Sequence, residues 1–159
     1  MYFLVQRVFL TLVLVGSCGL AGAADTSPTV SPPNDNLTPA RAQIAAKNWT
    51  GAIDELKRVN ATNSADWNNL MGYAHRRAKN PDYAAAEKFY DEALRIDPKH
   101  RGALEYSGEL FLIKGDLTKA EQRLSALDKA CFLPCEEFTD LKTAVTNYKA
   151  AGNKYVAKP

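Results

Sequence analysis

Apolar residues recur with a helical spacing along most of the chain, and the pattern itself repeats. Three segments open at Asn48, Asp82 and Asp116, which are 34 residues apart. From the next residue onward, apolar side chains follow at offsets of 0, 3, 7 and 10, which places them on one face of an α-helix. The three sets are Trp49, Ala52, Leu56, Val59; Tyr83, Ala86, Tyr90, Ala93; and Leu117, Ala120, Leu124, Leu127. Each opening Asn or Asp can accept hydrogen bonds from free backbone N–H groups, so each predicts a helix start.

Other helices alternate with these three. We expect helices over 38–47, 49–60, 64–79, 82–96, 99–114, 116–130 and 134–150. Thr38 is expected to cap the first helix, with Pro39 as its first helical residue. The last helix carries one apolar face, formed by Phe138, Leu141, Val145 and Tyr148. A one-sided helix of this kind suits the end of a stacked array.

Helix–turn–helix units of 34 residues are typical of the tetratricopeptide repeat (TPR) family. The family pattern is W-x2-L-G-x2-Y, then A-x3-F, then P. The corresponding residues of this chain are Trp67, Leu70, Met71, Ala74, Ala86, Tyr90, Ala93 and Pro98, with Met71 in place of the usual glycine. The chain therefore resembles that family over about 37–129, and its C-terminal part resembles small exported bacterial TPR proteins. The resemblance implies an all-α, TPR-type solenoid of about three repeats (37–63, 64–98 and 99–130) plus a C-terminal capping helix.

The aromatic residues of the repeats are expected to belong to the core. Small alanines let neighbouring helices approach closely, and Trp67, Tyr83, Tyr90 and Phe111 would fill the gaps between them.

The first 23 residues predict a secretory signal peptide. One positive charge, Arg7, precedes an apolar run and the small residues Ala21-Gly22-Ala23, so cleavage is expected after Ala23 or Ala24. A Pro/Ser-rich linker follows over 24–36. Two alternatives remain, an uncleaved anchor and a lipoprotein attached through Cys18, because Val15–Cys18 resembles a lipobox. After cleavage at Ala23 or Ala24 the protein is expected to be periplasmic or secreted, with no membrane span. The lipoprotein alternative would make it a lipid-anchored envelope assembly factor.

The composition and the motif content argue against several classes of function. The 159 residues are 46% apolar and carry 20 basic against 18 acidic side chains, so a nucleic-acid partner is not expected. Phosphate-binding, dinucleotide, zinc-protease and hydrolase motifs are absent from the sequence, and it has only two histidines, His75 and His100. We therefore expect no enzyme activity, no cofactor and no metal.

Cys131 and Cys135 flank the turn before the last helix, because Pro134 fits a first helical turn and not a helix interior. Export places these cysteines in an oxidising compartment, which favours a disulfide within segment 131–151. Two alternatives are an envelope thiol-redox pair and a copper-handling site, since two thiolates suit Cu(I).

In the TPR family the first helices of the repeats line a groove that receives a peptide or helix. Carried over residue by residue, the partner-binding groove would contain Arg41, Asn68, Gly72, His75, Arg76, Glu105 and Glu109. The sequence thus predicts an exported, non-catalytic protein-interaction module or adaptor whose partner is another protein or peptide of the cell envelope. It leaves the oligomeric state open and ends in a short tail, 152–159.

Overall fold

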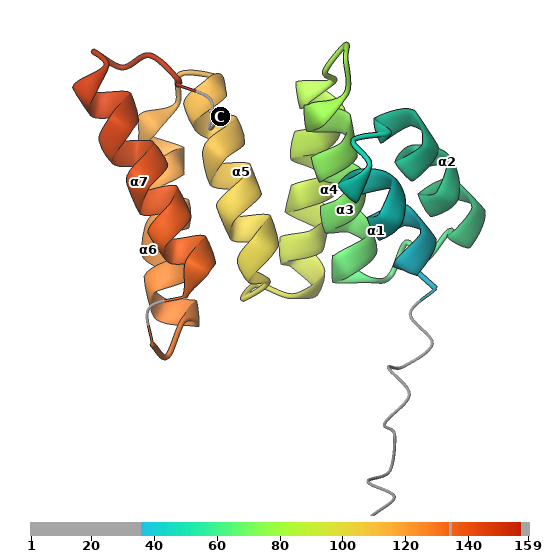
Figure 1. Ribbon diagram of the computed structural model, residues 1–159. Helices are drawn as coiled ribbons and strands as arrows, with labels where there is room; N and C mark the ends of the chain where they lie inside the picture. The colour runs from blue at the N-terminus through green and yellow to red at the C-terminus, as the bar shows by residue number, and fades with distance from the viewer. Residues whose placement is uncertain (1–35, 134, 157–159) are drawn as a thin grey trace, which may run out of the picture. The chain divides into compact units, whose positions relative to one another are not determined.

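The computed structural model describes residues 36–133 and 135–156, and over these residues the fold is all-α. The described residues form seven helices and no strand (Figure 1). The helices are α1 Thr38–Ala45, α2 Trp49–Val59, α3 Ala65–Arg77, α4 Tyr83–Ile96, α5 Arg101–Ile113, α6 Leu117–Ala130 and α7 Glu136–Ala150. Each lies within its predicted range, so the predicted fold class is confirmed. The predicted signal peptide, Cys18 and Pro134 lie outside the described residues.

The repeating helix starts have the predicted caps. The side chains of Asn48, Asp82 and Asp116 each accept a hydrogen bond from the backbone N–H three residues later, at 3.2, 2.9 and 3.0 Å. The first helix differs from the prediction. Leu37 occupies its N-cap position, and no side chain caps it. Thr38 is already helical, and Pro39 falls within the first turn, where its missing N–H leaves no intrahelical hydrogen bond unmade.

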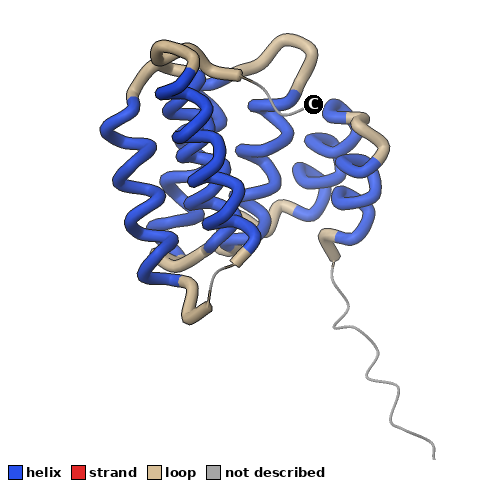
Figure 2. Tube along the Cα trace, turned by 60° about the vertical axis from the view of Figure 1, so that its left-hand side comes forward, coloured by secondary structure: helices blue, strands red, loops and turns tan. Residues whose placement is uncertain are grey.

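Consecutive helices pack as helix–turn–helix pairs. Contacts join α1 with α2, α3 with α4, and α5 with α6, and each second helix also contacts the next first helix (Figures 1 and 2). Helix α7 packs against both α5 and α6. The result is a solenoid-like stack in which α3 and α5, first helices of neighbouring pairs, also touch.

The predicted apolar stripe forms the core. Ala52, Ala86 and Ala120 are completely buried, and so is Tyr90. Trp67 and Phe111 are buried as expected, but Tyr83 is 36% exposed, so its assignment to the core was wrong. Tyr83 lies in the first turn of α4, beside the 78–82 connection, where it lines a cleft in place of filling a helix–helix contact.

Two glycines permit the closest helix contacts. A Cβ on Gly72 would lie 2.7 Å from the ring of Tyr90, and one on Gly108 would lie 2.5 Å from Leu141 of α7. Leu141 is buried together with Val145 and Tyr148, which confirms the predicted apolar face of the last helix. None of the helices described is both long and apolar enough to cross a membrane.

Candidate functional site

Two adjoining clefts open over α3 and α5, and three residues, Arg76, Arg77 and Tyr155, line both. The first cleft, of about 220 Å³, is completed by Tyr73, Glu105, Tyr106, Glu109 and Asp140. The second, of about 340 Å³, is completed by Lys47, Trp49, Ala78, Pro81, Tyr83 and Ile113. Because the two share a wall, we treat them as one feature, the aromatic groove.

Three aromatic rings from three helices run along this groove. The Trp49 ring of α2 meets the Tyr73 ring of α3 edge-on at 5.9 Å between centroids. The Tyr73 ring lies 4.7 Å from that of Tyr106 on α5. All three side chains are half-buried, so each presents part of its ring to the groove. The exposed Arg77 guanidinium lies 5.8 Å above Trp49, within cation–π range.

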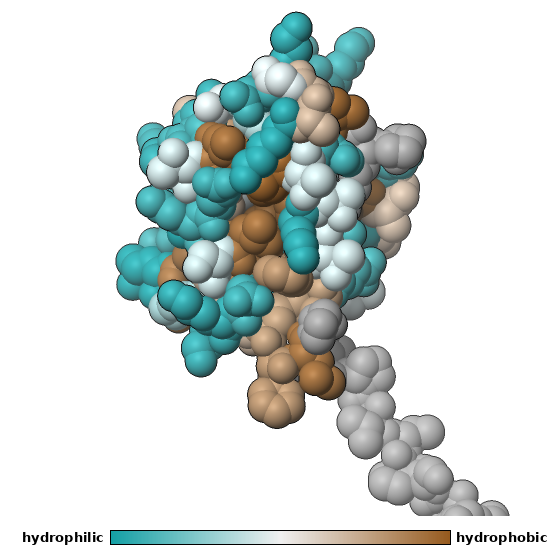
Figure 3. Space-filling model, turned by 90° about the vertical axis from the view of Figure 1, so that its left-hand side faces the viewer, coloured by the Kyte–Doolittle hydropathy of each residue, from teal (hydrophilic) through white to brown (hydrophobic). Residues whose placement is uncertain are grey.

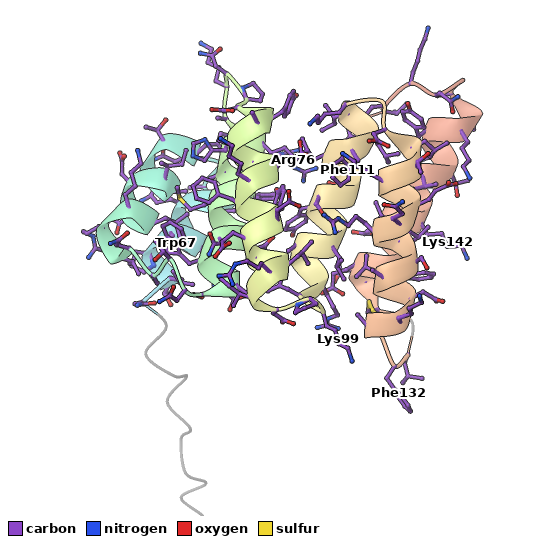
Figure 4. The ribbon with its side chains drawn as sticks, turned by 180° about the vertical axis from the view of Figure 1, so that it is seen from behind. Trp67, Arg76, Lys99, Phe111, Phe132 and Lys142 are labelled. Atoms are coloured by element: carbon purple, nitrogen blue, oxygen red, sulfur yellow. A yellow bond between two sulfur atoms is a disulfide. The ribbon has the colours of Figure 1, made fainter. Side chains whose placement is uncertain are left out.

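A buried ion pair forms the floor of the groove. Arg76 Nη1 donates to Glu109 Oε2 at 2.6 Å, and the two side chains are only 4% and 9% exposed. The Arg76 guanidinium also lies 5.5 Å from the ring centres of both Tyr73 and Tyr106, between α3 and α5 (Figure 4). Burial opposes its charge, but the oxygens of Tyr90 and Glu109 outweigh this effect and raise the pKa of Arg76. Arg76 therefore stays charged and joins two neighbouring repeats.

Tyr106 presents a neutral hydroxyl at physiological pH. Its pKa is raised, first by burial and then by the neighbouring carboxylate of Glu105. The groove therefore offers aromatic faces, a phenol and the exposed Arg77, which together suit contact with a polypeptide.

Only part of the predicted partner-binding groove coincides with the aromatic groove. Arg76, Glu105 and Glu109 line it, but all three are buried, and none is an open surface residue.

Three other predicted residues face α4. Gly72 lies under Tyr90, and the His75 ring stacks on Phe89 at 5.5 Å between centroids. Burial lowers the pKa of His75, and this effect exceeds the opposing influence of Asp82. The Asn68 amide donates to the carbonyls of Thr62 and Ser64 at 2.8 and 2.9 Å. Gly72 and His75 therefore pack α3 against α4, whereas Asn68 holds the turn before α3. None of the three lines the aromatic groove.

Arg41 takes part in a polar link between helix starts. It lies 3.6 Å from Asp66, whose other carboxylate oxygen is 2.9 Å from His100 Nε2. His100 Nδ1 accepts a hydrogen bond from Ala103 N–H, so the proton on the neutral ring belongs to Nε2 and is donated to Asp66. Arg41 lies outside the residues that line the groove.

The groove residues that sequence reasoning missed include the four aromatic residues Trp49, Tyr73, Tyr106 and Tyr155, together with the exposed Arg77. Trp49 was assigned to the repeating core stripe. Tyr73 and Tyr106 offered a usable signal, because each is an aromatic residue on a first helix outside that stripe. No feature of the sequence pointed to Tyr155, because it follows the last predicted helix.

The cysteine pair lies at the opposite end of α7 from the tail. The sulfur atoms of Cys131 and Cys135 are 2.01 Å apart, at disulfide distance, and their Cα atoms are 5.9 Å apart. Phe132 and Leu133, in the turn between them, are strongly exposed and line a cleft of about 570 Å³. Figure 4 shows Phe132 projecting away from the helices, and Figure 3 shows apolar side chains gathered at the lower end of the molecule. Across the described part of the chain, no three His, Cys, Asp or Glu side chains gather as metal ligands.

Comparison of the chain with protein-family models and with curated proteins finds no match. The architecture that is established is therefore the all-α, helix–turn–helix stack, and the resemblance to the TPR family rests on the residue pattern.

Proposed function

We propose that this protein is an exported, TPR-type interaction module that binds a protein or peptide of the cell envelope in its aromatic groove and has no catalytic role of its own. The observation that carries this proposal is the run of Trp49, Tyr73 and Tyr106 with Arg77 beside it. Tryptophan, tyrosine and arginine are enriched among the few residues that dominate the binding energy of protein interfaces. Tryptophan and tyrosine bury a large area at a small entropic cost, and arginine adds charge and a planar group that stacks on aromatic rings.

Export is supported by two independent features. The chain begins with an apolar stretch that ends in Ala-x-Ala, and Cys131 and Cys135 lie at disulfide distance. Structural disulfides persist in oxidising compartments such as the periplasm, so the partner is sought there.

The test is site-specific photo-crosslinking in an envelope extract of the host. A photo-reactive residue replaces Arg77 in the groove or, as the matched control, Arg95, an exposed arginine on α4 that is paired with Glu92. We expect one protein to be crosslinked from position 77 and not from position 95. The Arg77→Glu variant should lose capture of that same protein, while Arg95→Glu should retain it.

Two outcomes would reject this function. Crosslinks of equal yield at both positions would mean that the contact is non-specific. Unchanged capture by folded Arg77→Glu would place the interface elsewhere on the molecule.

A second candidate function, thiol–disulfide exchange, is favoured by one observation: both cysteines are only half-buried, and they adjoin an open cleft. A partner thiolate would attack one sulfur, form a mixed disulfide and release the other cysteine as a thiolate. The reverse direction can be trapped: the Cys131 thiolate of a Cys135→Ser variant would attack a disulfide of a partner, release one partner sulfur as a thiolate and stay joined to the other, because no second cysteine remains to displace it. Accumulation of such a mixed disulfide with one envelope protein would establish this activity. Absence of any such adduct would leave the pair a structural role.

A further inference from the structure

The chain reverses direction immediately after α7. Gly152 and Asn153 have positive φ angles of 68° and 62°. Their N–H groups donate to the carbonyls of Lys149 and Tyr148 at 3.1 and 2.9 Å, which is the Schellman arrangement that ends many helices. The turn directs Lys154–Val156 from the end of α7 back toward α5 (Figure 1).

One side chain of this returning segment enters the groove. Asn153, Lys154 and Val156 are exposed, whereas Tyr155 between them is half-buried. Tyr155 lines both clefts and also packs against the core cluster that contains Leu112. The buried Arg76 lines the same two clefts as Tyr155, and Tyr155 is among the groups that raise the pKa of Arg76. The tail therefore reaches the groove through a single aromatic anchor.

We propose that Asn153–Val156 is a built-in occupant of the aromatic groove and that the external partner is an extended peptide whose own aromatic side chain takes the place of Tyr155. This inference rests on the proposed function and adds the chemistry of the partner. An aromatic side chain at that position would restore both contacts of Tyr155, with the walls of the two clefts and with the core cluster that contains Leu112.

The tail is suited to being displaced. A short tether holds a segment at an effective concentration in the millimolar range, which is enough to keep a weak ligand in place. Tyr155 is the only half-buried side chain between Gly152 and Val156, so one residue carries most of the contact. A partner peptide with several contacts along Trp49, Tyr73 and Tyr106 can compete with this hold, and the tail raises the affinity that such a partner needs.

The experiment uses the whole protein and a fluorescent peptide with the sequence of Ala151–Val156, blocked at both ends. Its binding is measured by anisotropy to the unaltered protein, to Tyr155→Ala and to the control Val156→Ala, which changes an exposed neighbour (56% exposed). We expect Tyr155→Ala to bind the peptide at least tenfold more tightly than the other two proteins. A peptide with alanine in place of its tyrosine should not bind.

Equal affinity for all three proteins, or absence of binding to folded Tyr155→Ala, would overturn the inference.

Nitration by tetranitromethane provides a second measurement on the unaltered protein. Tyr155 should react more slowly than Tyr83, and equal or faster modification of Tyr155 would also overturn it. Failure of crosslinking from position 77 together with peptide binding would reject the proposed function and keep the tail assignment. Crosslinking from position 77 without any peptide binding would reject the tail assignment and keep the proposed function.

Discussion

At the residue scale, the least expected feature is the Arg76–Glu109 pair. The two side chains come from different repeats, are almost closed off from water and contact each other directly. Desolvation of two charges is costly, so such a pair adds little net stability compared with apolar residues, but removal of one partner leaves the other buried and uncompensated.

Arg76→Ala should therefore lower the free energy of unfolding by about 3–5 kcal/mol, measured by urea denaturation with circular dichroism. The control, Arg95→Ala, removes an exposed pair and should leave the urea midpoint unchanged. The double variant Arg76→Met with Glu109→Leu should be more stable than Arg76→Ala alone, because neither member of the pair is left as an uncompensated buried charge. A loss for Arg76→Ala no larger than that for Arg95→Ala would show that the pair is open to water in solution.

The same residues show where sequence reasoning stopped. Arg76, Glu105 and Glu109 were correctly placed on the first helices and brought to one groove, but they were expected to be available to a partner. A charged side chain on a helix is usually solvated. Only the position of α5 beside α3 buries these three.

At the scale of the elements, the alanine positions determine how closely helices pair. Ala86 faces the neighbouring helices and is completely buried, in a cluster with Tyr90 and Leu110. This position was readable from the sequence, because a small residue recurs at the same offset in each repeat.

Ala86→Leu should cost roughly 1–3 kcal/mol of stability, since three added carbons must displace well-packed neighbours. Ala84→Leu, two residues earlier on the exposed side of α4, is the matched control and should leave the melting temperature nearly unchanged. Calorimetry of both variants compares the two. If they melt together, the packing register of α4 is incorrect.

At the scale of the whole described array, α7 closes the end of the stack. Its apolar face covers α5 and α6, and its N-terminus is tied to the end of α6 through Cys131 and Cys135. The bridge closes a loop of only five residues, so it acts locally: it holds the start of α7 against the last repeat.

Reduction of this pair should lower the stability by about 2 kcal/mol, as expected from the chain entropy of a five-residue loop. Protection from hydrogen exchange should be lost first at the start of α7, while α2 to α5 stay protected. The Cys131→Ser, Cys135→Ser double variant should reproduce this pattern without reductant and should not respond when reductant is added. Two free thiols in native protein purified without reductant would contradict the bridge itself.

The sequence by itself determined the local features: seven helix ranges, the repeating caps, the buried alanine stripe, the apolar face of α7 and the proximity of the two cysteines. These depend on interactions within about one helical turn and on a period that can be counted along the chain. The tertiary structure decided which side chains meet between repeats. Three of these contacts join residues far apart in sequence: Tyr73 with Tyr106, Arg76 with Glu109, and Tyr155 with the groove. The exposure of Tyr83 likewise depends on which helices lie near it. Such contacts depend on how the helices stack, and the periodicity of each helix does not determine which side chains that stacking brings together.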